Sequence, residues 1–444
     1  MTDAVQPVAA PRVLPKGYSS YALTLLLVIY IFNFLDRQVI NILAEPIKQD
    51  LKLTDWQLGL MSGFAFAIFY TTLGVPIARM AERRNRPLII AGSLAAWSGF
   101  TVLCGQAQNF LQLCLFRIGV GVGEAGCTPP AHSLISDYFP KEKRASALAF
   151  YSMGVPLGSL LGMAMGGVIA DAYGWRVAFV VAGLPGLLLA VVVAFTLKET
   201  RSNLASDMAA AKAAQPSFSE AMKLLAGKPT FWLLAMAAAL KSFIGYGHAP
   251  FTASYFLRNH GEQVSELAGQ FGLQSVGFLG LALGLLSGTF GAASSMIGGW
   301  IADRVGAKDV RNIVIAPALA VSVTVPVFIA AILVDSVPMA LTLLVIPYLL
   351  NYFWYGPVYS TVQGIVPPNM RATAAALLLL IVNLIGLGLG PLAVGILSDY
   401  LNNGLGMGPA EGVRWALIIS ACSGLLSGVL FLMARRTIAR DMES

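Results

Sequence analysis

The sequence predicts an all-α membrane protein whose twelve transmembrane helices form two pseudo-symmetric six-helix bundles. Of its 444 residues, 57% are hydrophobic and only 11% are charged, against about 25% charged in an average soluble domain. Apolar stretches of about 20 residues, the length that crosses the hydrocarbon core as a helix, recur along the whole chain. Exposed backbone groups are costly in lipid and none of these stretches alternates like a barrel strand, so each is predicted to be a helix.

The predicted spans run from residue 20 to residue 434. They cover residues 20–45, 56–78, 87–107, 110–133, 146–171, 175–197, 229–257, 271–300, 311–334, 338–365, 372–398 and 413–434. The segment before them is polar and rich in Pro and Ala, and no small-residue cleavage site follows the first full-length span. The first span is therefore predicted to be a retained helix and not a signal peptide.

The longest polar interruption divides six spans from six. The predicted organisation is a cytoplasmic tail (1–17), a first bundle (18–197), a cytoplasmic linker (198–228), a second bundle (229–435) and a cytoplasmic tail (436–444). The segment FPKEKRASA at residues 139–147 aligns with VPPNMRATA at residues 366–374, and at the same offset Pro130 matches Pro357. Such internal repeats are typical of transporters that bind substrate between two halves near the bilayer midplane.

The basic residues predict the orientation, because they resist translocation across the membrane. With the amino terminus inside, the outer loops hold only five of the 29 Lys and Arg residues: Lys48, Lys52, Arg176, Arg258 and Arg414. Three more lie inside spans, and the remainder lie in inner segments. Both termini are therefore predicted to be cytoplasmic. The protein itself is predicted to lie in the cell (inner) membrane. The net charge of +7 matches an anionic inner leaflet and indicates no nucleic-acid partner.

Two loop motifs resemble a known family. Residues 299–308 (GWIADRVGAK) carry the small-x-x-x-Asp-Arg-x-Gly-x-Lys signature of the major facilitator superfamily, and residues 78–87 (ARMAERRNRP) are similar, with Glu82 for Asp and Asn85 for Gly. That Asn, NFLDRQ in the first span and FRIGVGVGEAG in the fourth resemble the Spinster branch. The resemblance implies the major facilitator fold, alternating access and an amphipathic anionic substrate such as a lysophospholipid or a sphingoid phosphate.

Asp36 and Glu124 are the acidic residues that fall inside predicted spans and away from their ends, where an ionisable group costs a few kcal/mol or more unless it is paired or hydrated. At about 1.5 Å of rise per residue, Asp36 is predicted level with Arg117, and Glu124 is predicted about two turns deeper, level with Lys241. Arg37 is predicted to turn toward Glu124 or toward the second half. We expect the two carboxyls to carry protons, with Arg37 and Arg117 tuning them; static ion pairs that fix helix packing are the alternative.

The predicted substrate site lies in the second half. Lys241 and His248 are seven residues apart on one helix face, and residues 351–359 (NYFWYGPVY) include Asn351 and Tyr355. A buried cation beside aromatic side chains with polar tips suits an amphipathic anion. The alternatives are a snorkelling lysine, a locally bonded histidine and aromatic core packing.

Charges in two inner loops are predicted to act as gates between conformations. They are Glu82, Arg83, Arg84 and Arg86 after the second span, and Asp303, Arg304 and Lys308 after the eighth. Their acidic groups are placed to hold the amino end of a helix or an arginine of the other half. The alternative is that these charges are simply solvated.

The sequence thus predicts a proton-coupled secondary transporter of an amphipathic anionic lipid. The alternative is a proton-coupled symporter or antiporter of a small organic anion, sugar acid or drug. A channel is disfavoured because no ring of like charges is visible. An enzyme is disfavoured because the chain holds only three histidines and no convergent acid-base cluster. The expected partners are protons, the substrate and the bilayer, with no cofactor and no metal, and the expected state is a monomer.

Overall fold

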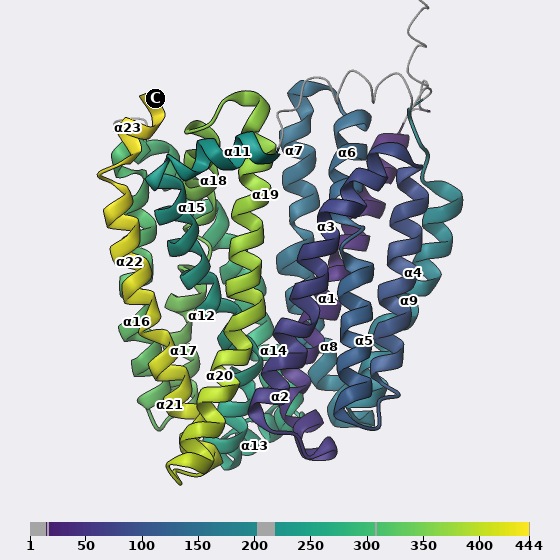
Figure 1. Ribbon diagram of the computed structural model, residues 1–444. Coiled ribbons are helices and arrows are strands. Elements are labelled where there is room, and N and C mark those ends of the chain that lie inside the picture. The colour runs from purple at the N-terminus through teal and green to yellow at the C-terminus, as the bar shows by residue number, and fades with distance from the viewer. Residues whose placement is uncertain (1–14, 16, 202–217, 307–308, 444) are drawn as a thin grey trace, which may run out of the picture.

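The computed structural model describes residues 15, 17–201, 218–306 and 309–443, and this part of the chain contains helices and no β-strand. Figure 1 shows the helices running roughly side by side between two ends of the molecule. The C-terminal helix α23 (Ile438–Glu443) lies at what we call the upper end, and α2 (Asp55–Gly59) and α13 (Gly261–Gln270) lie at the lower end. The all-helical prediction is confirmed.

The first half of the chain supplies six long helical segments. They are α1 (Tyr18–Leu51); α2, which passes through a π-helical turn (Leu60–Phe64) into α3 (Ala65–Arg83); α4 (Arg86–Cys104); α5 (Phe110–Glu124) with α6 (Thr128–Tyr138); α7 (Lys141–Ser152) with α8 (Gly154–Tyr173); and α9 (Trp175–Thr196). The second, fourth and fifth predicted spans are thus each built from two helices in line.

The second half begins with the short helix α11 (Phe218–Ala226). It continues with α12 (Pro229–Asn259), α13, α14 (Ser275–Leu285), a π-helical turn (Leu286–Phe290), α15 (Gly291–Gly306), α16 (Ile315–Leu333), α17 (Val337–Leu349), α18 (Tyr355–Gly364), α19 (Arg371–Val382), a second π-helical turn (Asn383–Leu389), α20 (Gly390–Asp399), α21 (Pro409–Ala421) and α22 (Ser423–Ala434). The π-helical turns after α2 and α14 occupy matching places in the two halves, as expected for a duplicated chain.

Eleven helical segments among the described residues are long and apolar enough to cross a membrane. The predicted tenth span, residues 338–365, is instead divided into α17 and α18 by a turn at residues 350–354. Pro347 and Pro357 flank this turn, and each removes one backbone N–H that a continuous helix would use. The backbone N–H of Tyr352 donates to Ser294 Oγ at 2.8 Å, so α15 partly compensates for the break.

Glycines allow the two halves to meet closely. A Cβ added at Gly59 of α2 would lie 2.1 Å from the carbonyl oxygen of Pro391 in α20, and one at Gly280 of α14 would lie 2.4 Å from the carbonyl oxygen of Met163 in α8. Both positions exclude any larger residue, because close backbone approach needs a missing side chain. The halves therefore pack through two seams, α2 on α20 and α8 on α14.

Candidate functional site

Glu124 at the end of α5 pairs with Arg37 of α1. Arg37 Nε donates to Glu124 Oε2 at 2.5 Å, and Glu124 is 1% exposed. The Arg37 guanidinium also lies over the rings of Phe34, Phe66 and Tyr70, at 5.1, 5.0 and 4.4 Å from their centroids. The predicted turn of Arg37 toward Glu124 is confirmed. The second carboxylate oxygen, Oε1, is buried and has no hydrogen-bond partner among the described residues.

Asp36 lies one residue before Arg37 but faces a different set of groups. Its Oδ2 accepts a hydrogen bond from Thr101 Oγ1 of α4 at 3.1 Å, and its Oδ1 is buried without a partner in the described chain. The expected pairing of Asp36 with Arg117 is wrong for this conformation. The Arg117 guanidinium instead lies 5.2 Å from the Phe66 ring centroid, and its Nε is also unpartnered among these residues.

The physical reason is that Phe66 lies within reach of both guanidiniums. Its π face attracts Arg37 and Arg117 alike, while the one strong carboxylate bond goes to Arg37. Depth along the helices placed Asp36 and Arg117 at one level, but which side chains touch depends on how α1, α3 and α5 are rotated. The cluster holds two buried carboxyls, and only Glu124 contacts a cation.

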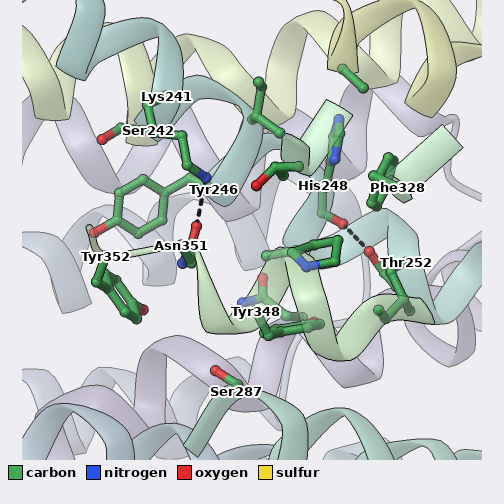
Figure 2. Close-up of a pocket in the computed structure, with 18 of the residues that line it drawn as sticks. Lys241, Ser242, Tyr246, His248, Thr252, Ser287, Phe328, Tyr348, Asn351 and Tyr352 are labelled. Atoms are coloured by element: carbon green, nitrogen blue, oxygen red, sulfur yellow. Dashed lines mark hydrogen bonds between the residues drawn. The ribbon is translucent and has the colours of Figure 1, made fainter. Parts of the chain in front are cut away.

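The predicted substrate residues Lys241, His248, Asn351 and Tyr355 come together around one cavity of about 140 Å³. Figure 2 shows Lys241 of α12 reaching the Asn351 side chain, with Nζ 2.8 Å from Oδ1. Helices of the second half form most of the wall. Gln38 and Asn41 of α1 also line the cavity, so it lies where the halves meet.

Lys241 is 4% exposed and makes no ion pair with any described carboxylate. Its partner is therefore a neutral amide. Lys241 was predicted at the same depth as Glu124, but the two side chains make no contact, because the Glu124 carboxylate pairs with Arg37. Asn351 reaches Lys241 because the turn between α17 and α18 departs from the helix at this point. A buried cation without a counter-ion is costly unless an anion enters from outside.

His248 lies farther along α12 at the other side of the cavity. Its ring stacks on Phe328 of α16, with centroids 4.6 Å apart and an interplanar angle of 21°. Its Nε2 is 2.9 Å from Ser420 Oγ of α21. Figure 2 shows His248 and Phe328 on the side opposite Lys241, with Tyr348 of α17 lower in the view.

The structure describes the side chains of some predicted gating charges and not of others. The side chains of Glu82, Arg83 and Asp303 lie outside the described residues, as does Lys308. The Arg304 guanidinium lies 4.0 Å from the ring centroid of Trp300, one turn earlier in α15. Among the described residues, the charges of the second-half loop have no partner in the first half. Their gating role therefore stays a prediction.

Arg86 at the start of α4 is held within the first half. It is 1% exposed, its Nε donates to Glu199 Oε1 at 3.1 Å, and its guanidinium is 2.7 Å from Asp137 of α6. Partial burial of Glu199 disfavours its charged form, but hydrogen bonds from Arg86 and Arg201 outweigh this effect and lower the pKa of Glu199 to about 2. Arg86 therefore clamps the segment after α9 to the upper ends of α4 and α6.

Glu199→Gln is expected to lower the melting temperature at pH 7, because it weakens the pairing of a buried guanidinium. The folded-state pKa of Glu199 is below the unfolded value of about 4.3. Its stabilisation is therefore complete above that value and disappears as the pH falls toward 2. Thermal melts of detergent-purified wild type and variant, from pH 7 down to pH 3, should show the difference shrinking. Glu142→Gln, at an exposed position in α7, is the control and should give no such trend.

A charged cluster at the lower end joins the two halves, and the sequence analysis missed it. Arg258 at the end of α12 pairs with Glu45 of α1 at 2.7 Å and with Asp55 of α2 at 2.8 Å. Lys48 also pairs with Asp55, at 2.6 Å. We call Glu45, Lys48, Asp55, Arg258 and Asp399 the lower latch.

Asp399 of α20 completes the lower latch by capping α2. Its carboxylate accepts the backbone N–H groups of Asp55 at 3.1 Å and Trp56 at 2.7 Å, where the helix dipole favours a negative charge. Ser398 Oγ also donates to Asp55 Oδ2 at 2.7 Å. Wherever both partners are described, the side-chain hydrogen bonds that join the halves lie at this lower end.

The sequence analysis did not single out these charges because they fall at or beyond the ends of apolar stretches. A usable signal was present: Lys48 and Arg258, two of the few basic residues of the predicted outer side, are predicted on the same side of the membrane as acidic residues at the ends of the first two spans. Which of them pair across the halves depends on the packing of α2 against α20.

The chain matches several known proteins along almost its whole length. The model of the Major Facilitator Superfamily matches residues 26–391. An MFS-type efflux pump of Mycolicibacterium smegmatis is 32% identical over 410 residues, which are 92% of this chain and 91% of the relative. Protein spinster homolog 3 of Danio rerio is 27% identical, covering 96% and 86%. A crystal structure of a bacterial homologue of the human lysosomal transporter Spinster, inward-facing and unoccupied, has a TM-score of 0.83 and 33% identity, covering 96% of this chain and 99% of that chain.

Proposed function

This chain belongs to the major facilitator superfamily, and on that basis we propose that it is a proton-coupled exporter of an amphipathic anionic lipid, of the lysophospholipid or sphingoid-phosphate class. Members of the family are multi-pass membrane transporters, and this chain resembles the Spinster branch. We further propose that it works by alternating access as a monomer in the cell membrane. The inner surplus of basic residues supports cytoplasmic termini, which makes the upper end cytoplasmic.

Two buried carboxyls with unequal partners support proton coupling, and this observation carries the proposal. Asp36 and Glu124 are each 1% exposed, each has one unpartnered oxygen within the described structure, and only Glu124 contacts a cation. A buried carboxyl without a cation avoids the cost of an unpaired charge by holding a proton. Movement of Arg117 between Phe66 and Asp36 as the halves rock would then load and release that proton.

The cavity supports an anionic, amphipathic substrate. Lys241 supplies a buried cation without a carboxylate partner among the described residues, and Asn351 beside it supplies a further donor. Tyr355 and other aromatic side chains from α12 and α17–α18 form a wall that is apolar with polar tips, which suits an acyl chain beside a headgroup. His248 lines the opposite side. The relative named as an efflux pump supports the outward direction.

The lower latch supports alternating access. It joins α1 and α2 of the first half to α12 and α20 of the second by buried ion pairs, at the end that we propose is extracellular. Closure there corresponds to an inward-facing state, the state of the similar crystal structure. We propose that Arg86 and Arg304, with Glu82, Arg83 and Asp303, act at the opposite end in the outward-facing state.

Uptake into proteoliposomes tests the proposed function directly. Labelled lysophospholipid and labelled sugar acid are offered in parallel, each with and without an imposed pH gradient. We expect the lipid to move several times faster down the driving gradient and to stop when the gradient is collapsed by an ionophore. Gradient-driven uptake of the sugar acid alone would establish the alternative substrate class, and lipid movement that ignores the gradient would contradict proton coupling.

Arg258→Ala is expected to release the lower latch. Removing the cation leaves Glu45 without an ion-pair partner and leaves Asp55 with Lys48 as its remaining cation, and loss of one partner from a buried pair costs about 3–5 kcal/mol. The closed state should therefore lose population by at least about tenfold relative to the state open at the lower end. Hydrogen exchange should become faster at the backbone amides of α2 and α20 and stay unchanged in α4 and α9.

Arg176→Ala is the matched control for the lower latch. Arg176 pairs with Asp50 at 2.5 Å at the same end, but both side chains are over 40% exposed and both belong to the first half. Exposed pairs contribute about 1 kcal/mol or less, so exchange in α2 and α20 should stay as in the wild type. Equal effects of Arg176→Ala and Arg258→Ala would show that the cluster does not act as a latch.

A further inference from the structure

The cavity has two chemically different ends, and the first presents hydrogen-bond donors. Lys241 Nζ carries three N–H groups and uses one on Asn351 Oδ1. Because a cation approaches the oxygen of an amide, the Asn351 Nδ2 group remains as a further donor at this end. Figure 2 shows this pair on one side of the cavity. A ligand group that docks here must supply acceptors, and an anion does so best.

The other end presents an acceptor at His248. The Ser420 hydroxyl has one proton, which it donates to the carbonyl oxygen of Ala416 at 2.7 Å. The carbonyl oxygen of Leu417 is a second acceptor for that proton within the same helix, at 3.1 Å. On this basis we assign the Ser420 oxygen as the acceptor and His248 Nε2, 2.9 Å away, as the atom that carries the imidazole proton. An imidazole has an ordinary pKa of about 6.5 and is neutral above pH 7, which leaves a lone pair on Nδ1. That atom makes no hydrogen bond within the described residues.

Two threonines add further hydrogen-bond acceptors at this end of the cavity. Thr252 Oγ1 donates to the carbonyl oxygen of His248 at 2.9 Å, and Thr324 Oγ1 donates to the carbonyl oxygen of Ala320 at 2.8 Å. Both hydroxyl protons are used inside their own helices, so both oxygens are left to act as acceptors. Thr252, Thr324 and His248 all line the cavity, and stacking on Phe328 holds the imidazole in place.

We infer that the substrate carries, besides its anionic group, a hydrogen-bond donor, either an ammonium or a hydroxyl group, and that His248 Nδ1 selects for it. This inference rests on the proposed transport of an amphipathic anion and adds the second recognition group. Lys241 and His248 are seven residues apart, which is roughly 10 Å along the helix.

Three synthetic probes with one alkyl chain separate the contributions. Dodecyl phosphate has the anion and no second donor, 2-hydroxydodecyl phosphate adds a hydroxyl, and 2-aminododecyl phosphate adds an ammonium. Their affinities for the purified full-length protein are measured by calorimetry at pH 7.5. We expect at least one donor-bearing probe to bind about tenfold or more tightly than dodecyl phosphate, and the stronger of the two identifies the donor.

Two substitutions at one position give matched variants. His248→Gln keeps an N–H within reach of Ser420 but has no acceptor where Nδ1 lies, so it should lose the preference for the donor-bearing probe. His248→Asn places its side-chain oxygen near the Nδ1 position and gives up the Ser420 contact, so it should keep most of the preference. Equal loss in both variants would show that His248 acts only by packing and would overturn the assignment.

The inference and the proposed function fail in different ways. If the three probes bind the wild type equally and Lys241→Ala weakens all of them, the second recognition group is wrong while the anion site stands. If no probe binds, or Lys241→Ala changes nothing, the anionic lipid itself is wrong and the inference falls with it.

Discussion

We expect Asp36→Asn and Glu124→Gln, made singly, to abolish the proposed proton-driven transport and to leave the protein folded in the membrane. An amide has nearly the shape of the carboxyl that it replaces but cannot bind and release a proton in the working pH range. The amide introduced by Asp36→Asn keeps a polar group next to Thr101, and no buried negative charge remains there to be paired. We expect gradient-driven uptake to fall about 100-fold or more, to background, because a step that carries the proton is missing.

Downhill exchange separates this loss from misfolding. Exchange of labelled for unlabelled substrate at equal pH needs no net proton movement, so Asp36→Asn should retain it. Glu124→Gln leaves Arg37 without its carboxylate, but three aromatic rings within about 5 Å remain as cation–π partners. Asp50→Asn, which removes an exposed carboxylate at the lower end, should transport normally. Full gradient-driven uptake in both variants would end the proton-carrier proposal.

We expect Lys241→Met to weaken binding of an anionic amphiphile by about 10- to 100-fold. A hydrogen bond to a charged group contributes about 1.5–3 kcal/mol, and about 1.4 kcal/mol corresponds to a factor of ten in affinity. Met fills much of the volume of the lysine stem, so the comparison isolates the charge. Calorimetric titration with dodecyl phosphate measures the loss, and a neutral monoacylglycerol of equal chain length should bind the variant and the wild type alike.

The stability of Lys241→Met distinguishes a binding role from a structural one. Lys241 is buried and its partner in the structure is the Asn351 amide, so replacing the ammonium with an apolar group should leave the melting temperature unchanged or raise it. Unchanged affinity for dodecyl phosphate would contradict the anion site. A large fall in melting temperature would instead show that Lys241 holds α12 to the turn after α17.

The sequence determined the architecture, because the hydrocarbon core imposes a simple rule on length and polarity. Eleven of the twelve predicted spans correspond to helical segments of spanning length in the described chain. The remaining one, the tenth, departs from the prediction at residues 350–354 because hydropathy measures side chains, whereas Pro347 and Pro357 act on the backbone. The family resemblance followed from the same regularity, since the loop signatures stand at fixed places between spans.

The sequence also singled out the ionisable residues, because charge in an apolar span is rare enough to be a signal by itself. Asp36, Glu124 and Lys241 are all buried in the structure, and Lys241 shares its cavity with the other predicted substrate residues. Composition alone is sufficient for this step. It requires no knowledge of which helices are neighbours.

Only the tertiary structure decided which of these groups touch. Depth along a helix is set by rise per residue, but a contact also needs the rotation of each helix and the identity of its neighbour. Glu124 pairs with Arg37, Arg117 lies over Phe66, and Lys241 bonds Asn351 because of those rotations. The lower latch depends on them most, since Arg258 is more than 200 residues from Glu45 and Asp55 in sequence and meets them only because glycines let the two halves pack closely at that end.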